Sequence, residues 1–418
     1  MFLGHAHIGG PDRVRHWRRS GQNTDTHLNA NDIQGEGSLM TEIRVAIIGG
    51  GGFMGYAHSL GWALAPIAAD AGATIRKSVL VEADEERAKA AAKRLNWDEW
   101  SADWRQVIAR DDIDVVDIVT PPAAHAEIAI AALAAGKHVF VEKPISNDLA
   151  EADLMQAAAE KSSVVSQVGF NYRHAPAITF IKRMLDDGTL GHPLQFRAHY
   201  TQDVGVLGRV LSGWRAKKGA GGSGVTGDIG SHIIDLASYL VGDIDSVTGI
   251  IGAKDPADDT AWLPDKQRRA GQHLDDAALW MAKFTNGAIG SFAATVYASG
   301  RKNRMFFELE CTRGNVEFDW NHSDELKLSL VSDPPEQQGF RTVSMNENHD
   351  DFWWPLGGMG SGYVDDAALQ LQKFVKAIVE GRSGAPSFAD ATRTQRVIAA
   401  VMESADSLRW VTVDEVTA

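Results

Sequence analysis

The sequence predicts an α/β protein with two domains: a doubly wound parallel sheet, then an α+β domain with an open, mostly antiparallel sheet. Between residues 40 and 168, short apolar runs alternate with helical stretches, and no hairpin signal separates them, which favours a parallel sheet. After residue 168 several expected strands follow one another directly, and Asn286-Gly287 is a strong hairpin signal. We therefore expect domains at 40–168 and 169–418, preceded by an extension at 1–39.

The extension at 1–39 differs from the rest of the chain in composition. It holds four of the 14 histidines, and its four arginines are balanced by four acidic residues. The segment after Arg18-Arg19 is polar, which argues against an export signal, and a histidine pair near the start lacks further metal ligands. We expect a disordered tail or a non-native extension upstream of Met40.

Charge and composition exclude several classes of protein. The 418 residues carry a net charge of −14, whereas proteins that bind nucleic acid or an anionic membrane need a basic surface. The single cysteine, Cys311, allows no intrachain disulfide and favours a reducing compartment, so we expect a cytoplasmic location. No stretch approaches the roughly 18 apolar residues of a membrane-spanning helix.

A glycine-rich loop follows the first expected strand, 44–48, which is typical of a buried parallel strand. Three of its glycines satisfy the pattern G-x-G-x-x-G before a helical stretch. In this pattern the first glycine allows a tight turn, the second lets the backbone approach a pyrophosphate, and the third lets the helix pack closely. A glycine turn without a ligand is the alternative. The expected dinucleotide-binding residues of this loop are Gly50, Gly52, Phe53, Met54 and Gly55.

Acidic residues follow the second expected strand, 77–81. A carboxylate at this place hydrogen-bonds the ribose 2′-hydroxyl of NAD and repels the 2′-phosphate of NADP. Glu82 is the first candidate and Asp84 the second, although Asp84 also suits the N-cap of an expected helix at 85–95. The sequence thus favours NAD over NADP, with Arg87 as the nearby residue that would favour the opposite choice.

Further strands and helices complete the parallel sheet. The expected strands are 114–119, 137–141 and 164–168, and the expected helices are 125–135 and 148–161. Because ligands bind at the carboxyl ends of such strands, the residues that follow them are candidates for the cofactor site. These cofactor-binding candidates are Thr120, Pro121, His125, Glu142 and Lys143.

The second domain is expected to combine a run of strands with a few helices. The expected strands are 194–202, 247–253, 277–285, 288–298, 305–311, 314–320 and 325–331, and the expected helices are 176–187, 229–241, 365–380 and 390–408. The stretch 332–364 has little periodicity, which indicates a long ordered loop, and we expect it near the active site.

Six segments together give the chain a resemblance to a known family. They are Ala46–Gly55, Ala123–His125, Ala135–Val139, Glu142–Pro144, Gly169–Arg173 and Gly227–His232. With them the chain from Arg44 onward resembles the Gfo/Idh/MocA family of oxidoreductases. Ala57–Leu60, Thr201–Asp203 and Gly357–Tyr363 are most similar to its sugar and inositol dehydrogenases, including levoglucosan dehydrogenase-like members. The resemblance implies a Rossmann domain, bound NAD, and a homodimer or homotetramer formed through the second sheet.

Oxidation of a secondary alcohol needs a base for the hydroxyl proton and an acceptor for the hydride. Asp228 and His232 are spaced to share one helix face, and Lys143 ends a strand beside the expected cofactor. We assign His232 as general acid/base, Lys143 as the donor that positions the reacting oxygen, and Asp228 as partner of the substrate or the histidine. The resemblance implies the same three residues. Asp228 also suits the N-cap of its helix, and no third ligand accompanies it to form a zinc site.

Other polar and aromatic residues are substrate-binding candidates by the same resemblance. They are Asn171, Tyr172, Arg173, Gln202, Asp203, Trp214 and Arg215. The sequence thus predicts an NAD-dependent dehydrogenase that converts a sugar, anhydrosugar, glycoside or inositol to a keto-sugar. Two alternatives remain: a redox-neutral glycosidase or epimerase with tightly bound NAD, and a non-catalytic nucleotide-sensing protein. No metal, nucleic acid or membrane is expected as a partner.

Overall fold

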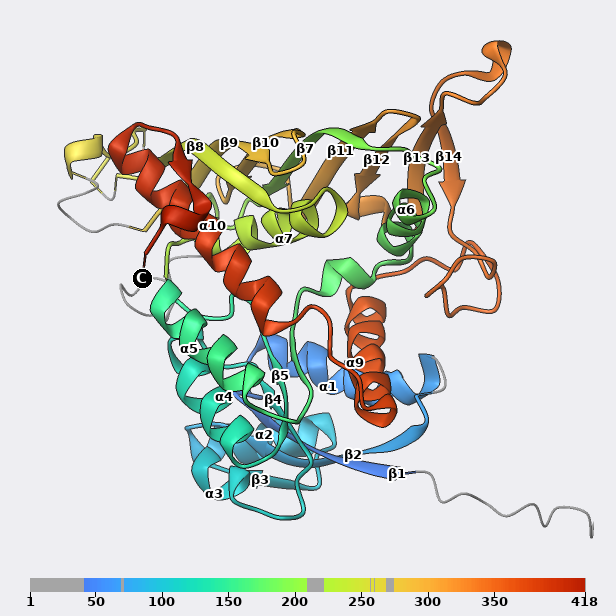
Figure 1. The fold of residues 1–418 in the computed structure, drawn as a ribbon. Helices are drawn as coiled ribbons and strands as arrows, with labels where there is room; N and C mark the ends of the chain where they lie inside the picture. Colours follow the sequence, from blue (N-terminus) through green and yellow to red (C-terminus); the bar gives the residue numbers. More distant parts are fainter. Residues whose placement is uncertain are drawn as a thin grey trace, which may run out of the picture. The chain divides into compact units, whose positions relative to one another are not determined.

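The computed structural model describes residues 41–68, 71–208, 222–255, 257–258, 260–267 and 274–417. The extension at 1–39 and the candidates Trp214 and Arg215 lie outside these residues, so what the sequence predicts for them stays a prediction. Two sheets, each with its own helices, make up the described part of the chain (Figure 1). Within that part, no helix combines the length and the apolar character needed to cross a membrane.

The first sheet has six parallel strands in the order β3-β2-β1-β4-β5-β6, which confirms the predicted doubly wound sheet. Its strands are β1 (Thr41–Ile48), β2 (Ala73–Val81), β3 (Glu99–Ser101), β4 (Val115–Ile118), β5 (His138–Val141) and β6 (Ser166–Val168). Its helices are α1 (Phe53–Ala68), α2 (Glu85–Leu95), α3 (Trp104–Ile108), α4 (His125–Ala134) and α5 (Leu149–Glu160). The strand order reverses between β1 and β4, which is where such sheets bind ligands. The sequence did not predict the short elements β3 and α3.

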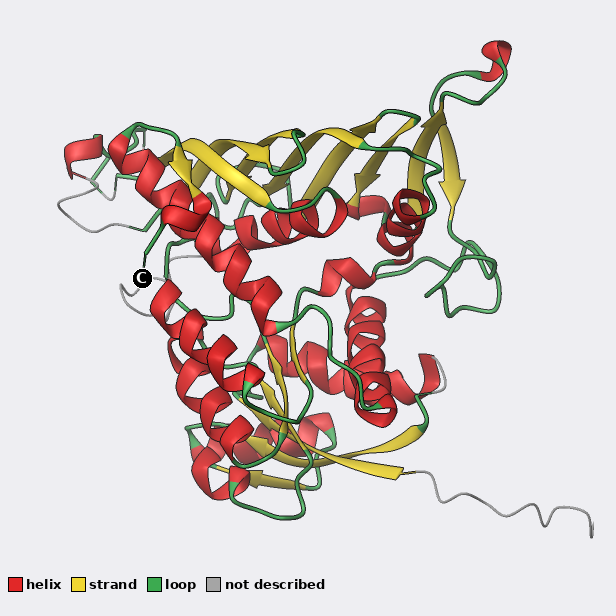
Figure 2. Cartoon of the chain, viewed as in Figure 1, coloured by secondary structure: helices red, strands yellow, loops and turns green. Residues whose placement is uncertain are grey.

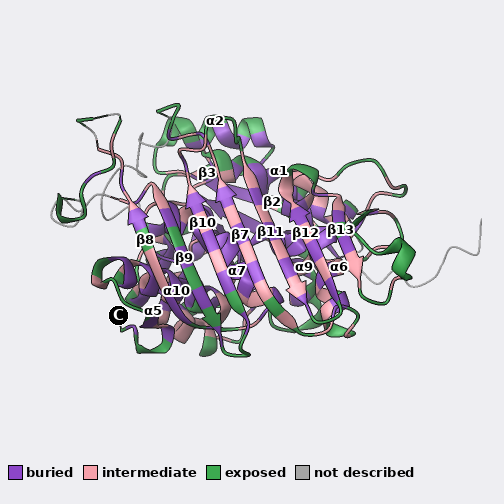
Figure 3. Ribbon diagram, turned by 90° about the horizontal axis from the view of Figure 1, so that it is seen from above, coloured by how far each residue is buried: buried purple, intermediate pink, exposed green. Residues whose placement is uncertain are grey.

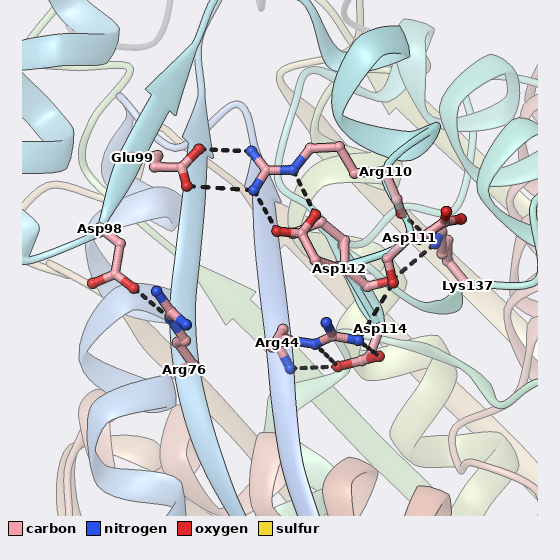
Figure 4. Close-up of polar contacts among 10 residues, drawn as sticks. Arg44, Arg76, Asp98, Glu99, Arg110, Asp111, Asp112, Asp114 and Lys137 are labelled. Atoms are coloured by element: carbon pink, nitrogen blue, oxygen red, sulfur yellow. Dashed lines mark hydrogen bonds and ion pairs between the residues drawn. The ribbon is translucent and has the colours of Figure 1, made fainter.

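Ion pairs link strands β1 and β3 to the loop that precedes β4 (Figure 4). Arg44 of β1 donates to both carboxylate oxygens of Asp114, which precedes β4, at 2.9 and 2.7 Å. Arg110 bridges Glu99 and Asp112, at 2.6 and 2.7 Å. These side chains are half-buried or exposed, so we expect each pair to contribute little to stability.

The second sheet has nine strands in the order β14-β13-β12-β11-β7-β10-β9-β8-β15. Its strands are β7 (Pro193–Thr201), β8 (Ile244–Gly252), β9 (Ala277–Phe284), β10 (Ile289–Thr295), β11 (Arg304–Cys311), β12 (Gly314–Asp319), β13 (Glu325–Leu330), β14 (Arg341–Ser344) and β15 (Val411–Thr412). Neighbouring strands are antiparallel except β7 and β10, which are parallel, so the prediction of a mostly antiparallel sheet is confirmed. Strand β14 lies inside the stretch 332–364, so the prediction that this whole stretch is a loop is wrong at these residues.

Helices cover one face of the second sheet and leave the other uncovered (Figures 1 and 2). The covering helices are α6 (Pro176–Asp186), α7 (Ser231–Leu240) and α10 (Phe388–Ser407). Burial alternates along β9 and β11, as a sheet with one packed face requires (Figure 3). On the uncovered side Ile250, Leu279 and Met281 are each more than half exposed, at 58, 53 and 53%. We call this surface the open face.

Helix α9 (Tyr363–Glu380) packs with the first sheet, although it lies within the predicted second domain, 169–418. Leu371 and Phe374 share a core with Trp62 of α1. A Cβ atom on Gly61 would lie 3.0 Å from the carbonyl oxygen of Ala367, so α1 and α9 approach closely at this glycine. The domain boundary at residue 168 stays a prediction, and α9 is the element that crosses it.

Candidate active site

The glycine loop after β1 has the space that a dinucleotide needs. A Cβ atom on Gly52 would meet no atom within 4 Å, so the backbone there is open to an approaching ligand. At Gly55 a Cβ would lie 2.2 Å from the carbonyl oxygen of Gly50, so only glycine lets α1 pack on the loop. Phe53 and Met54 form the first turn of α1. A helix N-terminus beside open backbone favours an anion, so the loop fits the pyrophosphate of NAD.

Glu82 and Asp84 have different partners after β2. The Glu82 carboxylate accepts a hydrogen bond from the backbone N–H of Gly51 at 3.2 Å, which places it at the glycine loop. Asp84 is the N-cap of α2 and accepts from the backbone N–H of Arg87 at 2.8 Å. The geometry therefore supports Glu82 as the ribose-binding candidate and gives Asp84 the capping role that the sequence offered as its alternative. The Arg87 guanidinium lies 3.6 Å from the Glu82 carboxylate.

His125 joins the loop after β4 to the loop after β5. Its Nε2 is 2.9 Å from the carbonyl oxygen of Thr120, and its Nδ1 is 3.1 Å from that of Pro144. Burial lowers the pKa of this imidazole. Pro121 precedes a short 3-10 turn at Pro122–Ala124, from which α4 continues. Both ring nitrogens thus face protein carbonyls, and His125 shapes the loops at the expected cofactor site.

Lys143 and Asp228 are paired across the two halves of the chain. The Lys143 ammonium donates to the backbone carbonyl oxygen of Asp228 at 2.6 Å and to its Oδ1 at 3.2 Å. The lysine side chain is only 14% exposed. These two bonds hold the ammonium in one place, as a donor that positions a reacting oxygen requires.

His232 lies on α7, and its buried ring contacts Tyr172 edge-on with the ring centroids 4.7 Å apart. Its Nδ1 is buried and has no hydrogen-bond partner among the described residues. Burial lowers the pKa of His232 well below its ordinary value, and the Lys143 ammonium lowers it further. The imidazole is therefore neutral near physiological pH, and one of its ring nitrogens has a lone pair that can accept a proton. We call Lys143, Asp228 and His232 the Lys–Asp–His cluster.

A π-helical turn, Thr226–Gly230, contains Asp228 and leads directly into α7. The expected N-cap role of Asp228 is therefore wrong, because Asp228 lies inside this turn and no side chain caps it. Asp275 holds the turn from outside, since its Oδ2 accepts from the N–H and the hydroxyl of Thr226 at 2.8 and 2.6 Å. Such π turns are frequent at functional sites.

Glu142 is buried and occupied by protein partners. Its Oε1 lies 3.1 Å from Nε2 of His58, and its Oε2 accepts from the backbone N–H of Lys143 at 3.2 Å. A Cβ atom on Gly169 would lie 2.4 Å from Oε1, so glycine is needed there to admit the carboxylate. This geometry supports a positioning role for Glu142 rather than direct contact with the cofactor.

Three substrate-binding candidates lie on the short turn Asn171–His174. Tyr172 lies against His232, and its hydroxyl is 2.7 Å from that of Tyr200. Asn171 is buried, and its Nδ2 has no hydrogen-bond partner among the described residues. Arg173 instead forms a buried two-bond ion pair with Asp235 at 2.7 and 2.6 Å. Tyr172 and Asn171 thus remain candidates for substrate contact, whereas the Arg173 pair supports a structural role.

Gln202 and Asp203 follow β7 and have different neighbours. The Gln202 side chain donates to the Asn303 amide oxygen at 2.7 Å, and the Asn303 amide donates to the Tyr172 hydroxyl at 3.3 Å. Gln202 is therefore connected to the site through Asn303. Asp203 accepts from the Lys302 ammonium at 2.6 Å, which makes it part of a separate ion pair.

Tyr363, the first residue of α9, is a candidate site residue that was not predicted from the sequence. Its hydroxyl donates to Sδ of Met54 in the glycine loop at 3.5 Å. Burial raises the pKa of Tyr363 well above its ordinary value, and Glu142 and Asp228 are among the acidic groups that raise it further. The side chain thus lies against the first turn of α1, where its ring is also 5.8 Å from that of Phe53. The signal available was the segment 357–363, noted only for its resemblance to sugar dehydrogenases.

The assembled groups suit alcohol oxidation. The neutral imidazole of His232 lies with the fixed ammonium of Lys143 and the carboxylate of Asp228. Lys143 and the glycine loop both follow the carboxyl ends of strands of the first sheet. The described part of the chain contains no group of three or more histidine, cysteine, aspartate or glutamate side chains placed to hold a metal ion.

Known proteins are similar to this chain in sequence. Residues 43–170 match the model of the Gfo/Idh/MocA oxidoreductase family, NAD-binding Rossmann fold, and residues 178–317 match that of its C-terminal domain. Levoglucosan dehydrogenase of Pseudarthrobacter phenanthrenivorans is 37% identical over 399 residues, which cover 91% of this chain and 100% of that protein.

Solved structures have a similar fold over about nine-tenths of this chain. Levoglucosan dehydrogenase in complex with NADH and levoglucosan gives a TM-score of 0.83 at 38% identity, covering 90% of this chain and 100% of that one. An NAD binding oxidoreductase from Klebsiella pneumoniae gives 0.80 at 30% identity, covering 89% and 99%.

Proposed function

The chain belongs to the Gfo/Idh/MocA family and is an NAD-dependent dehydrogenase of sugar CH–OH groups, and from this premise we propose that it oxidises an anhydrosugar of the levoglucosan type. The product is a keto-sugar formed at one secondary hydroxyl. The observation that supports this substrate class most strongly is similarity along the whole length of levoglucosan dehydrogenase, at 37% identity. Other sugars, glycosides and inositols are the neighbouring substrate classes.

The Lys–Asp–His cluster is proposed to move the proton. Bound NAD supplies the acceptor for the hydride that leaves the carbon. His232 takes the proton from the substrate hydroxyl, since its lowered pKa keeps it neutral beforehand. Lys143 donates a hydrogen bond to the reacting oxygen and stabilises the negative charge that develops there. Asp228 accepts from Lys143 and so fixes the direction of the ammonium.

The choice of NAD is proposed to depend on Glu82. Its carboxylate is held at the glycine loop by the Gly51 N–H, where a 2′-phosphate would meet negative charge. Arg87 is a nearby cation, but its guanidinium already lies 3.6 Å from that carboxylate. Glu82 therefore disfavours NADP even with Arg87 beside it.

A substrate panel tests the proposed reaction. Purified protein is mixed with NAD and with levoglucosan, free sugars, glycosides or inositols, and NADH absorbance is followed. We expect the highest kcat/KM with levoglucosan or a related anhydrosugar. A higher kcat/KM with a free sugar or an inositol would contradict the proposed anhydrosugar substrate. Conversion of a substrate without net formation of NADH would indicate the redox-neutral alternative.

The open face of the second sheet is proposed to bind a second copy of this chain. Ile250, Leu279 and Met281 expose apolar surface on adjacent strands, which is unfavourable in water. A cytoplasmic location is proposed as well, which a single cysteine in 418 residues supports. The mass of the purified protein by light scattering tests the assembly, and a monomer would contradict it.

A further inference from the structure

A chain of buried polar contacts connects α1 to the loop that contains Lys143. His58 of α1 is its centre: Nδ1 lies 3.0 and 2.9 Å from the two carboxylate oxygens of Asp117, and Nε2 lies 3.1 Å from Oε1 of Glu142. Trp62, one turn further along α1, donates to the Asp117 carboxylate at 2.7 Å. The other oxygen of Glu142 accepts from the backbone N–H of Lys143. We call Trp62, Asp117, His58 and Glu142 the buried relay.

The relay is enclosed on every side by the protein. His58 and Asp117 have no exposed surface, and Glu142 is only 5% exposed. Phe140 of β5 packs edge-on against the His58 ring at 5.6 Å, and Phe374 of α9 packs against Trp62 at 6.5 Å. Water is thus kept away, and a change at one member must be accommodated by the others.

Charge explains why the relay holds together. Burial alone lowers the pKa of His58, but Asp117 from β4 and Glu142 after β5 outweigh it and raise that pKa to about 10. The ring is therefore an imidazolium at neutral pH, and each nitrogen donates to a different carboxylate. The ring neighbours Phe140 and Phe374 add no charge, and the titratable groups Tyr363 of α9 and His125 of α4 interact with Glu142.

We propose that His58 is a positioning residue for Lys143: it holds Glu142, and Glu142 holds the backbone of Lys143, so that the ammonium reaches the substrate oxygen. This inference rests on the proposed role of Lys143. Since small displacements of a reacting group cost large factors in rate, loss of the relay is expected to lower kcat while the glycine loop still binds NADH.

Two aspartates of the same strand region offer a matched comparison. Asp117 lies in β4 and binds His58. Asp114 lies just before the amino-terminal end of β4 and forms an ion pair with Arg44 of β1 (Figure 4). We expect Asp117→Asn and His58→Gln to lower kcat at least about tenfold, with less than a twofold change in the Kd of NADH. Asp114→Asn is expected to leave both values within about twofold of wild type. If buried Asp117→Asn fails to fold, Trp62→Phe removes one bond to Asp117 and is expected to lower kcat about threefold.

A double-mutant cycle separates positioning from a general structural effect. Combined with Lys143→Met, His58→Gln is expected to lower the residual single-turnover rate by less than about twofold, because the group it positions is gone. Equal losses in both backgrounds, or wild-type kcat in His58→Gln, would overturn the inference. Full turnover by Lys143→Met alone would instead contradict the proposed function, so the two failures are distinguishable.

Discussion

Gly52→Ala is the substitution that tests the cofactor site most selectively. A Cβ atom at this position meets no protein atom within 4 Å, and the backbone does not require a positive φ. The protein without ligand is therefore expected to keep its free energy of unfolding within about 0.5 kcal/mol of wild type. The added methyl group would lie where the second glycine lets the backbone approach the pyrophosphate. We expect the Kd of NADH to rise at least tenfold, which corresponds to about 1.4 kcal/mol.

Fluorescence titration with NADH measures the Kd, and thermal unfolding with and without NADH provides an independent readout. At a concentration about 100 times the wild-type Kd, NADH stabilises the wild type by about 2.7 kcal/mol, and Gly52→Ala is expected to lose about half of this. Gly55→Ala is the matched control. Its Cβ would lie 2.2 Å from the Gly50 carbonyl oxygen, so it is expected to cost about 1–3 kcal/mol even without ligand. Wild-type NADH affinity in Gly52→Ala would refute the reasoning and leave the loop as a turn without a ligand.

Three further predictions follow from the same structure. Glu82→Ser is expected to lower the ratio of kcat/KM with NAD to kcat/KM with NADP at least about tenfold. Asp84→Asn retains a side chain that can cap α2, so it is expected to leave this ratio unchanged. Equal ratios in the two variants would contradict the role of Glu82. The folded pKa of His58 is about 10 against an ordinary 6.5, so its stabilisation is complete below pH 6.5 and is lost as the pH rises towards 10. Denaturant unfolding across this interval should show that loss in wild type and a smaller one in His58→Gln, and parallel curves would contradict the raised pKa. Met281→Glu on the open face is expected to shift the light-scattering mass to that of a monomer, and an unchanged assembly would exclude this face as the contact.

Sequence periodicity predicted the parts of the fold in which neighbours along the chain determine the structure. The apolar run of β1 and the glycines that follow have their meaning within one strand–turn–helix unit, so the position of the loop was predictable. The same holds for the hairpin at Asn286-Gly287, which joins β9 to β10 in the second sheet.

Contacts between distant parts of the chain were not predictable in this way. His58 lies 59 positions from Asp117 and 84 from Glu142, and no local pattern indicates that the three meet in a buried relay. Glu142 was therefore predicted from the sequence to bind the cofactor, whereas in the structure its carboxylate contacts His58 and the backbone N–H of Lys143. Tyr363 was missed for the same reason, since only the return of α9 to the first sheet brings it to the glycine loop.

Local hydrogen bonding explains the other differences. Asp84 and Asp228 each lie next to the start of an expected helix, and residue type alone allows each to be the N-cap of its helix. The structure makes Asp84 a cap, but it places Asp228 inside a π-helical turn held by Asp275, which comes from a distant part of the chain. Spacing along the sequence identified the Lys–Asp–His cluster without showing the backbone that carries it.

A single-turnover experiment tests the central claim most directly. Enzyme in excess over levoglucosan, preloaded with saturating NAD, is followed by NADH absorbance in wild type, Lys143→Met and His232→Asn. We expect rapid NADH formation in wild type and at least about a hundredfold slower formation in both variants, with unchanged NADH affinity in His232→Asn. Wild-type rates of NADH formation in either variant would contradict the assignment of the Lys–Asp–His cluster to the chemical step.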